Sequence, residues 1–283
     1  MTSPPQFQGK SNAITNPWAR PFQNRVSENV LEAGAFIWHE SLSCVFPVAI
    51  FAILAITQAV DLPIPRYDAI LVGAVFVQWA LVASGLETTE ELKVISVFHV
   101  IGLGLELFKT HPAIGSWSYP DEAWSKVGGV PLYSGFLYAS VASYMVQAWR
   151  RMHLRLERQP PLAVALALCL AIYANFFTHH HPAIGDLRWW LMGLVLIVYG
   201  RTQVYYRPLR DEHRMPLVLA FALIAAFVWI AENIATILEA YRYPDQVHEW
   251  TWVHSSKFSS WFLLVIFSFV LVSWHKERQA TRK

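Results

Sequence analysis

One apolar stretch of the sequence carries three residues that could exchange protons: His99, Glu106 and Lys109. His99 and Glu106 are seven residues apart, two helical turns, so their side chains share one helix face, and Lys109 lies near it. A charged group in mid-bilayer costs about 3 kcal/mol even on the mildest scale, so these side chains should face protein or water. Glu106 could therefore be a general acid or a proton carrier. The structural alternative is an ion pair of Glu106 with Lys109 or His99 that locks neighbouring helices together.

A second carboxylate, Glu232, lies beside Asn233 in the apolar run from Ala225 to Leu238. Two carboxylates from different helices in one cavity could divide acid and base roles, with Glu106 as the acid and Glu232 as its partner. Aromatic side chains would then form walls for an apolar substrate or a carbocation. The residues expected to bind substrate are Trp117, Tyr119, Trp229, Asn233 and Tyr243. The alternative is helix–helix hydrogen bonding through Asn233.

A run of three histidines suggests a metal site, because imidazole and carboxylate groups are common ligands of zinc and iron. Adjacent side chains point in different directions, so only one or two of the three could bind one ion. The candidate ligands of a divalent metal are His179, His180 and Asp186. The alternative is a hydrated loop whose histidines meet lipid headgroups or water. No other cofactor is predicted.

The composition indicates the class of protein that must position these side chains. Of the 283 residues, 55% are hydrophobic and only 15% are charged, which is far more apolar than an ordinary soluble domain. The net charge of +2 is too small to suggest nucleic-acid binding, and the basic residues lie in short loops between apolar runs. We therefore expect a lipid bilayer as the partner and exclude nucleic acid.

The hydropathy pattern predicts an all-α transmembrane bundle of about eight helices. The apolar runs cover residues 35–60, 68–86, 93–109, 131–149, 161–178, 189–206, 216–238 and 258–274. We expect a polar N-terminal arm over 1–34, one transmembrane domain over 35–275 and a short basic tail over 276–283. The simplest interpretation of this arm is a disordered tail.

The distribution of Lys and Arg predicts the orientation. With both termini cytoplasmic, 16 of the 22 basic residues lie on the inner side. The six on the outer side are Arg66, Lys109, Lys126, Arg188, Arg242 and Lys257. The loops after the third, fifth and seventh runs then open together on the outer side. The location expected is the cytoplasmic (inner) membrane of a bacterium, crossed several times.

Two short motifs recur along the chain. Tyr119-Pro-Asp121 follows Glu106 much as Tyr243-Pro-Asp245 follows Glu232, which could mark a parallel repeat of four plus four helices. A second echo, His-Pro-Ala-Ile-Gly at 111–115 and 181–185, has a different offset, so the two cannot belong to one repeat. Recurrent aromatic and proline loops at a membrane interface are the alternative.

Several motifs together resemble a bacterial multi-pass membrane family, domain of unknown function 817 (DUF817, YoaT-like). They lie at 98–109, 115–120, 129–135, 186–189 and 231–236. The resemblance covers about residues 30–275 and implies a polytopic inner-membrane protein; it transfers no activity.

A local likeness to membrane lycopene cyclases and carotenoid hydratases covers one helix and one loop. Glu106, then Gly115-x-Trp-x-Tyr119, then Gly128 and Pro131 are similar to their motifs, although Leu132, Tyr133 and Ser134 stand where a further carboxylate is expected. Those enzymes protonate long polyenes. The leading hypothesis is therefore a membrane enzyme that acts on a lipid or isoprenoid by carboxylate acid–base chemistry. A proton-coupled transporter of a small molecule and a scaffold without turnover are the alternatives.

Overall fold

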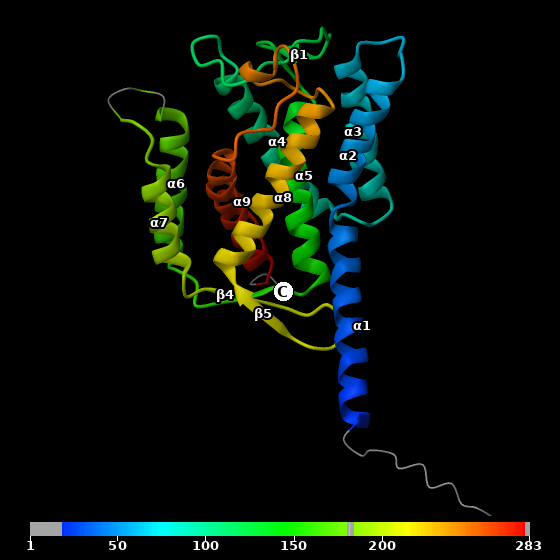
Figure 1. Ribbon diagram of the computed structural model, residues 1–283, viewed down its shortest axis with the longest axis vertical. Helices are drawn as coiled ribbons and strands as arrows, with labels where there is room; N and C mark the ends of the chain where they lie inside the picture. Colours follow the sequence, from blue (N-terminus) through cyan, green and yellow to red (C-terminus); the bar gives the residue numbers. More distant parts are fainter. Residues whose placement is uncertain (1–18, 180, 182–183, 281–283) are drawn as a thin grey trace, which may run out of the picture.

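A computed structural model describes residues 19–179, 181 and 184–280 of the chain. Helices dominate the described residues (Figure 1). The α-helices are α1 (Ala19–Ser43), α2 (Val45–Ala59), α3 (Arg66–Ala83), α4 (Thr89–Lys109), α5 (Ser134–Arg151), α6 (Leu162–Thr178), α7 (Arg188–Tyr199), α8 (Leu217–Ile237) and α9 (Lys257–Ala280). The strands are β1 (Lys126–Val127), β2 (Val130–Pro131), β3 (Arg155–Glu157), β4 (Gln203–Tyr206) and β5 (His213–Pro216), and η1 (Pro244–Gln246) is a single 3₁₀ turn.

Each predicted apolar run contains a helix, with two differences. The first run is broken, because α1 and α2 meet at a bend of 55°. The sixth run ends early as a helix, since Gln203–Tyr206 forms strand β4. Helix α1 already begins at Ala19, inside the segment assigned to the polar arm; residues 1–18 of that arm lie outside the described residues. Helix α9 continues through Ala280, into the predicted tail.

Three described helices are long and apolar enough to cross a membrane: α3, α8 and the Lys257–Lys276 part of α9. The bent pair of α1 and α2 makes a fourth candidate if it is counted as one span. Helices α6 and α7 are apolar but shorter. The fold is therefore a helical one with three or four candidate membrane spans, fewer than the eight expected.

Local sequence signals explain where several helices start. Thr88 forms a capping box with Glu91: the Thr88 hydroxyl accepts from the Glu91 N–H at 3.2 Å, and the Thr88 N–H donates to the Glu91 carboxylate at 3.0 Å. Pro65, Pro161 and Pro216 immediately precede α3, α6 and α8, where a missing N–H costs nothing.

The helices stand side by side, and their two ends differ (Figure 1). One end, which we call the loop end, carries the connections 110–133 after α4 and 238–256 after α8. The other, the sheet end, carries an antiparallel sheet in the order β3-β4-β5. Helix α1 begins and α9 ends toward the sheet end. The described chain thus starts and finishes on the same side of the bundle.

The interior of the bundle is aromatic as well as aliphatic. The largest side chains with less than 2% exposure include Tyr67, Tyr133, Phe46 and Phe221. Tyr133 packs against Tyr67 with ring centroids 5.2 Å apart, and its hydroxyl donates to the Ala240 carbonyl. This side chain therefore ties the start of α5 to the end of α8, directly beneath the connections of the loop end.

Candidate active site

Glu106 lies in the last turn of α4 and is 3% exposed. Its carboxylate accepts three hydrogen bonds from neutral donors. The Trp117 indole N–H donates to Oε2 at 2.6 Å, the Tyr119 hydroxyl donates to the same oxygen at 2.8 Å, and the Tyr138 hydroxyl donates to Oε1 at 2.8 Å. The loop after α4 and helix α5 therefore both hold this carboxylate.

Glu232 lies near the end of α8, is 5% exposed and has an equivalent environment. The Trp261 indole N–H donates to Oε2 at 2.6 Å, and the Tyr243 hydroxyl donates to Oε1. Tyr241 makes a longer contact of 3.5 Å with Oε1. Each carboxylate thus has one tryptophan and two tyrosines as partners, supplied by the following loop and the following helix.

The loops that supply these donors pair with each other. Ser118 and Arg242 form an antiparallel bridge, in which the Ser118 N–H donates to the Arg242 carbonyl at 2.9 Å and the return bond is 3.0 Å. Each of these residues precedes the tyrosine of a Tyr-Pro-Asp motif, so the bridge joins equivalent positions. Trp117 lies 6.4 Å from Tyr241 and 6.1 Å from Tyr243, between ring centroids. The two carboxylates therefore share one aromatic layer, and the arrangement has approximate two-fold symmetry.

The loop tyrosines of this layer are held as neutral hydrogen-bond donors. Burial raises the pKa values of Tyr119, Tyr241 and Tyr243 well above the ordinary value, and the negative charges of Glu106 and Glu232 raise them further. The phenols consequently keep their protons and can donate to the carboxylates.

A cavity of about 1570 Å³ lies below the aromatic layer and has a mostly apolar lining. Its polar end includes Glu106, Glu232, Trp117 and Tyr243, and the lining continues along α2, α5, α8 and α9 to strands β4 and β5. The cavity therefore extends from the carboxylates toward the sheet end. Its volume exceeds the roughly 300–1,000 Å³ of an ordinary small-molecule pocket, and it has room for a long apolar chain.

Two predicted partners of Glu106 lie elsewhere. The Lys109 ammonium donates to the Phe176 carbonyl at 2.8 Å and lies 4.1 Å from the centroid of the Phe176 ring. His99 packs edge-on against Phe136 at 4.5 Å, and its Nδ1 is buried with no hydrogen bond to any described residue. His99 belongs to the α4–α5 contact and not to the cavity lining. Lys109 does line the cavity, but it does not pair with Glu106.

Trp229 and Asn233 hold the loop before α9. The Trp229 indole donates to the Val253 carbonyl at 3.2 Å, and the Val253 N–H donates to the Asn233 side chain at 2.9 Å. Asn233 also donates to the Trp229 carbonyl at 2.8 Å. Neither side chain lines the cavity, so both support the loop that carries Tyr243 and neither is placed to contact a substrate.

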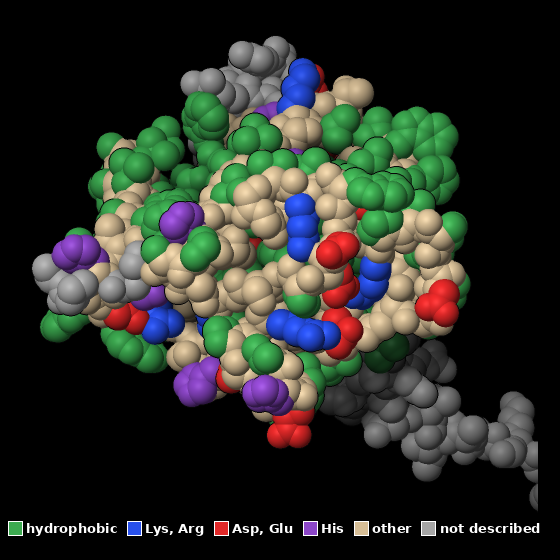
Figure 2. Space-filling view, turned by 90° about the horizontal axis from the view of Figure 1, so that it is seen from above, with side chains coloured by type: hydrophobic (Ala, Val, Ile, Leu, Met, Phe, Trp, Pro, Cys, Tyr) green, Lys and Arg blue, Asp and Glu red, His purple; other side chains and the backbone are tan. Residues whose placement is uncertain are grey.

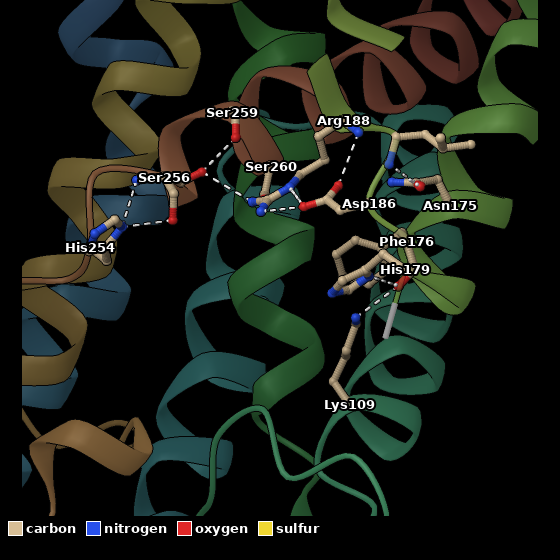
Figure 3. Close-up of polar contacts among 11 residues, drawn as sticks. Lys109, Asn175, Phe176, His179, Asp186, Arg188, His254, Ser256, Ser259 and Ser260 are labelled. Atoms are coloured by element: carbon tan, nitrogen blue, oxygen red, sulfur yellow. Dashed lines mark hydrogen bonds and ion pairs between the residues drawn. The ribbon is translucent and has the colours of Figure 1, made fainter. Parts of the chain in front are cut away.

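The predicted metal ligands have other partners (Figure 3). Asp186 accepts from the Arg188 guanidinium at 2.6 Å and 2.5 Å, and His179 Nδ1 lies 3.1 Å from the Phe176 carbonyl. Burial acts to raise the pKa of Asp186, but Arg188 outweighs it and holds that pKa below its ordinary value. His180 lies outside the described residues. Within the described part of the chain, no group of three or more His, Cys, Asp or Glu side chains is arranged to hold a metal ion.

Sequence reasoning did not identify Tyr138, Tyr241 or Trp261 as partners of the carboxylates. Tyr138 and Trp261 lie one helix further along, 32 and 29 residues after their respective glutamates, which is beyond any local spacing rule. Alignment of the two halves of the chain on their Tyr-Pro-Asp motifs could have identified them. In that alignment Tyr138 and Trp261 fall at nearly the same position, each about 30 residues after a glutamate.

Comparison with known proteins supports the resemblance noted in the sequence. A family profile described as "Protein of unknown function (DUF817)" matches residues 32–269. A protein of Bacillus subtilis (strain 168) described as "Uncharacterized protein YoaT" is 56% identical over 239 residues, which cover 84% of this chain and 89% of that protein. No solved structure gives a significant match.

Proposed function

Since this chain belongs to the DUF817 family, whose function is unknown, we propose from its own residues that it is a membrane-embedded enzyme acting on a lipid or isoprenoid by acid–base chemistry. One observation carries this proposal: two buried carboxylates stand at the polar end of a largely apolar cavity of about 1570 Å³. Apolar ligands enter such cavities, and convergent polar groups mark the place where chemistry can occur.

The two carboxylates can divide the work of a proton-initiated reaction. Protonated Glu106 would add its proton to a carbon–carbon double bond, which leaves a carbocation on the substrate. Ionised Glu232 would remove a proton from a neighbouring carbon, so that a new double bond forms and one proton has entered while another has left. The net change in the substrate is a shifted double bond or a ring closure. The proton taken up by Glu232 would return to Glu106 by exchange with solvent before the next turnover, so no co-reactant is consumed.

The aromatic layer is suited to a cationic intermediate. The Lys257 ammonium already lies 4.5 Å from the centroid of the Tyr243 ring and 5.7 Å from that of Trp117. Such contacts are worth about 0.5–2 kcal/mol, more where water is excluded. A substrate carbocation that reached a face of Trp117 or Tyr243 not covered by Lys257 would be stabilised in the same way.

We further infer that the chain crosses the bacterial inner membrane eight times with both termini cytoplasmic. The excess of basic residues on the inner side supports this orientation, as does the return of α9 to the end at which α1 begins (Figure 1). Large apolar side chains on the outward faces suit contact with lipid: Phe76 is 61%, Trp190 81% and Ile197 79% exposed. Figure 2 shows the loop end from above: charged side chains gather near the middle of this surface, and hydrophobic side chains surround much of its rim.

The two-fold arrangement favours a second candidate, a proton-coupled transporter. Parallel repeats occur in transporters, whose substrate and ion sites lie where the repeats meet. Here the Ser118–Arg242 bridge joins equivalent loops, and each half contributes one carboxylate. In that case Glu106 and Glu232 would bind a coupled proton during transport and would carry out no turnover.

The test is a comparison of strains that express the wild type, Glu106→Gln or Glu232→Gln. Glu90→Gln is the matched control, because Glu90 is exposed at the far end of α4 and pairs with Lys93 there. We expect both buried variants, but not the control, to change the lipid or isoprenoid profile measured by mass spectrometry. Unchanged profiles in both buried-carboxylate variants would refute the proposed enzyme activity. Uptake of a small molecule that collapses with the proton gradient would favour the transporter.

A further inference from the structure

Three cationic side chains line the cavity near its polar end: Lys109, Arg188 and Lys257. They come from three different helices, at the end of α4 and at the first positions of α7 and α9. Hydrogen bonds bring them together: Arg188 donates to the carbonyl of Ser256, the residue before Lys257, at 3.3 Å. Lys109 donates to the carbonyl of Phe176, and the neighbouring Asn175 accepts from the N–H of Leu187, the residue before Arg188. Like charges gathered in a partly buried site are unfavourable unless something compensates them.

The described residues compensate this charge only in part. Arg188 pairs with Asp186, but among the described ion pairs none involves Lys109 or Lys257. Lys109 is 2% exposed; its ammonium donates to the Phe176 carbonyl and lies over the rings of Phe176 and Phe108. Lys257 lies over the faces of Tyr243 and Trp117. Asp186 acts on Lys109 electrostatically, and Glu232 and Asp245 act on Lys257, but none of these carboxylates forms an ion pair with either ammonium among the described residues. The hydrogen bonds of Glu232 come from tryptophan and tyrosine.

We propose that Lys109, Arg188 and Lys257 bind the phosphate head of an amphipathic ligand whose apolar chain lies in the cavity. This inference rests on the proposed function for the occupancy of the cavity, and it adds the chemical class of the occupant. A phosphate could form the direct ion pairs that the two lysines lack among the described residues, and it accepts hydrogen bonds from ammonium and guanidinium groups together.

The local structure holds Arg188 ready for this role (Figure 3). Its guanidinium donates to Asp186 on one side and, on the other, to the Ser260 hydroxyl at 3.0 Å and the Ser256 carbonyl at 3.3 Å, which leaves one N–H for a ligand. The start of α7 is tied to α6, because the Leu187 N–H donates to the Asn175 side chain at 2.9 Å. Arg188 and Lys257 also stand at the positive ends of two helix dipoles, which adds to the attraction for an anion. The arginine is thus preorganised before any ligand arrives.

The experiment measures binding to the full-length protein in detergent by calorimetry. The probes are dodecyl phosphate, dodecanol with the same chain and no charge, and inorganic phosphate with the same charge and no chain. The variants are Lys257→Met and Lys109→Met. Lys93→Met is the matched control, because Lys93 is an exposed lysine near the start of α4, toward the sheet end. Lys257→Arg preserves the charge and reports whether the site still folds.

We expect dodecyl phosphate to bind the wild type more tightly than either of the other probes. Each methionine variant should lose about tenfold in affinity, the size of one charge-assisted hydrogen bond. Lys93→Met should bind like the wild type, and Lys257→Arg should retain most of the affinity. A loss in Lys257→Met without a loss in Lys257→Arg separates the role of the charge from damage to the fold.

Two results would overturn the inference and leave the proposed function standing. One is equal affinity for dodecanol and dodecyl phosphate, with no change in the methionine variants. It would mean that the cavity binds an apolar chain and that the three cationic side chains do not bind a phosphate head. Equal affinity for inorganic phosphate would assign the site to a free anion instead of a lipid. If none of the probes binds, the inference fails together with the occupancy of the cavity on which the proposed function depends.

Discussion

Gly102 on α4 provides a test of how helix packing holds the candidate site. A Cβ atom at this position would lie 2.5 Å from Cγ and Cδ2 of Tyr138, so an alanine cannot enter unless that ring moves. The Tyr138 hydroxyl donates to Glu106, so the same movement weakens the hold on the carboxylate. Gly104, two residues further along the helix, has nothing within 4 Å of the equivalent atom.

The expected magnitudes for the two alanine variants have opposite signs. Replacing glycine by alanine inside a helix stabilises it by about 1 kcal/mol, which is the full effect expected for Gly104→Ala. For Gly102→Ala the overlap costs about 1–3 kcal/mol, and loss of the bond to the carboxylate costs about 1.5–3 kcal/mol more. After the helix gain is subtracted, Gly102→Ala should destabilise the protein by about 1.5–5 kcal/mol.

Thermal melting in detergent measures this difference. In a Cys44→Ser background the remaining cysteine is Cys169, which is 3% exposed, so a thiol-reactive dye reports unfolding when this side chain becomes accessible. We expect Gly102→Ala to melt below the wild type and Gly104→Ala to melt at or above it. Tyr138→Phe, which removes the hydroxyl and keeps the ring, should show only the hydrogen-bond part of the loss. If Gly102→Ala melted as high as Gly104→Ala, the close contact of α4 with Tyr138 would be refuted.

Three further predictions concern the loop end. Asp68 accepts from the Trp124 and Ser125 N–H groups at 2.8 Å and 2.9 Å. Asp68→Asn should therefore cost about 1–3 kcal/mol and speed proteolysis within 111–131, and equal cleavage rates would contradict this. Arg66 donates to the Leu238 carbonyl at 2.5 Å, so Arg66→Met should lower the melting temperature by exposing the end of α8; an unchanged melting temperature would count against this cap. The pKa values of Tyr119 and Tyr243 are raised in the folded protein, so above a pH of about 10 these phenols ionise more readily in the unfolded chain. Stability should therefore be retained below a pH of about 10 and should fall as the pH rises above it. Tyrosinate absorbance that titrates in the folded protein as in free tyrosine would contradict the last prediction.

The sequence was sufficient to predict the helices because long apolar runs have one stable arrangement in a bilayer, with every backbone polar group bonded inside the helix. The bend between α1 and α2 and strand β4 could not be predicted in this way. Strand β4 pairs with β3, where Arg155 lies opposite Tyr205, 50 residues later in the chain, and it also pairs with β5. Such pairing depends on distant residues, which a local hydropathy pattern does not contain.

The candidate site was only partly predictable for the same reason. Glu106 and Glu232 were identified because a carboxylate in an apolar run is rare and costly. Their partners were harder to identify, since helical spacing favoured Lys109 and His99, which share a face with Glu106. In the structure the loop after α4 folds back over the helix end, and Trp117 and Tyr119 satisfy the carboxylate without an ion pair. Lys109 faces α6 instead.

The central claim, that the cavity holds an apolar chain, is tested most directly by mass spectrometry of the molecules retained by the protein after purification in detergent. Wild type is compared with Ala220→Trp, which places a large side chain in the cavity lining of α8. Leu219→Trp is the control, because Leu219 is adjacent on the same helix and is 48% exposed outside the lining. The account predicts a lipid or isoprenoid retained by wild type and Leu219→Trp and lost from Ala220→Trp. An empty wild-type protein, or equal retention by Ala220→Trp, would contradict it.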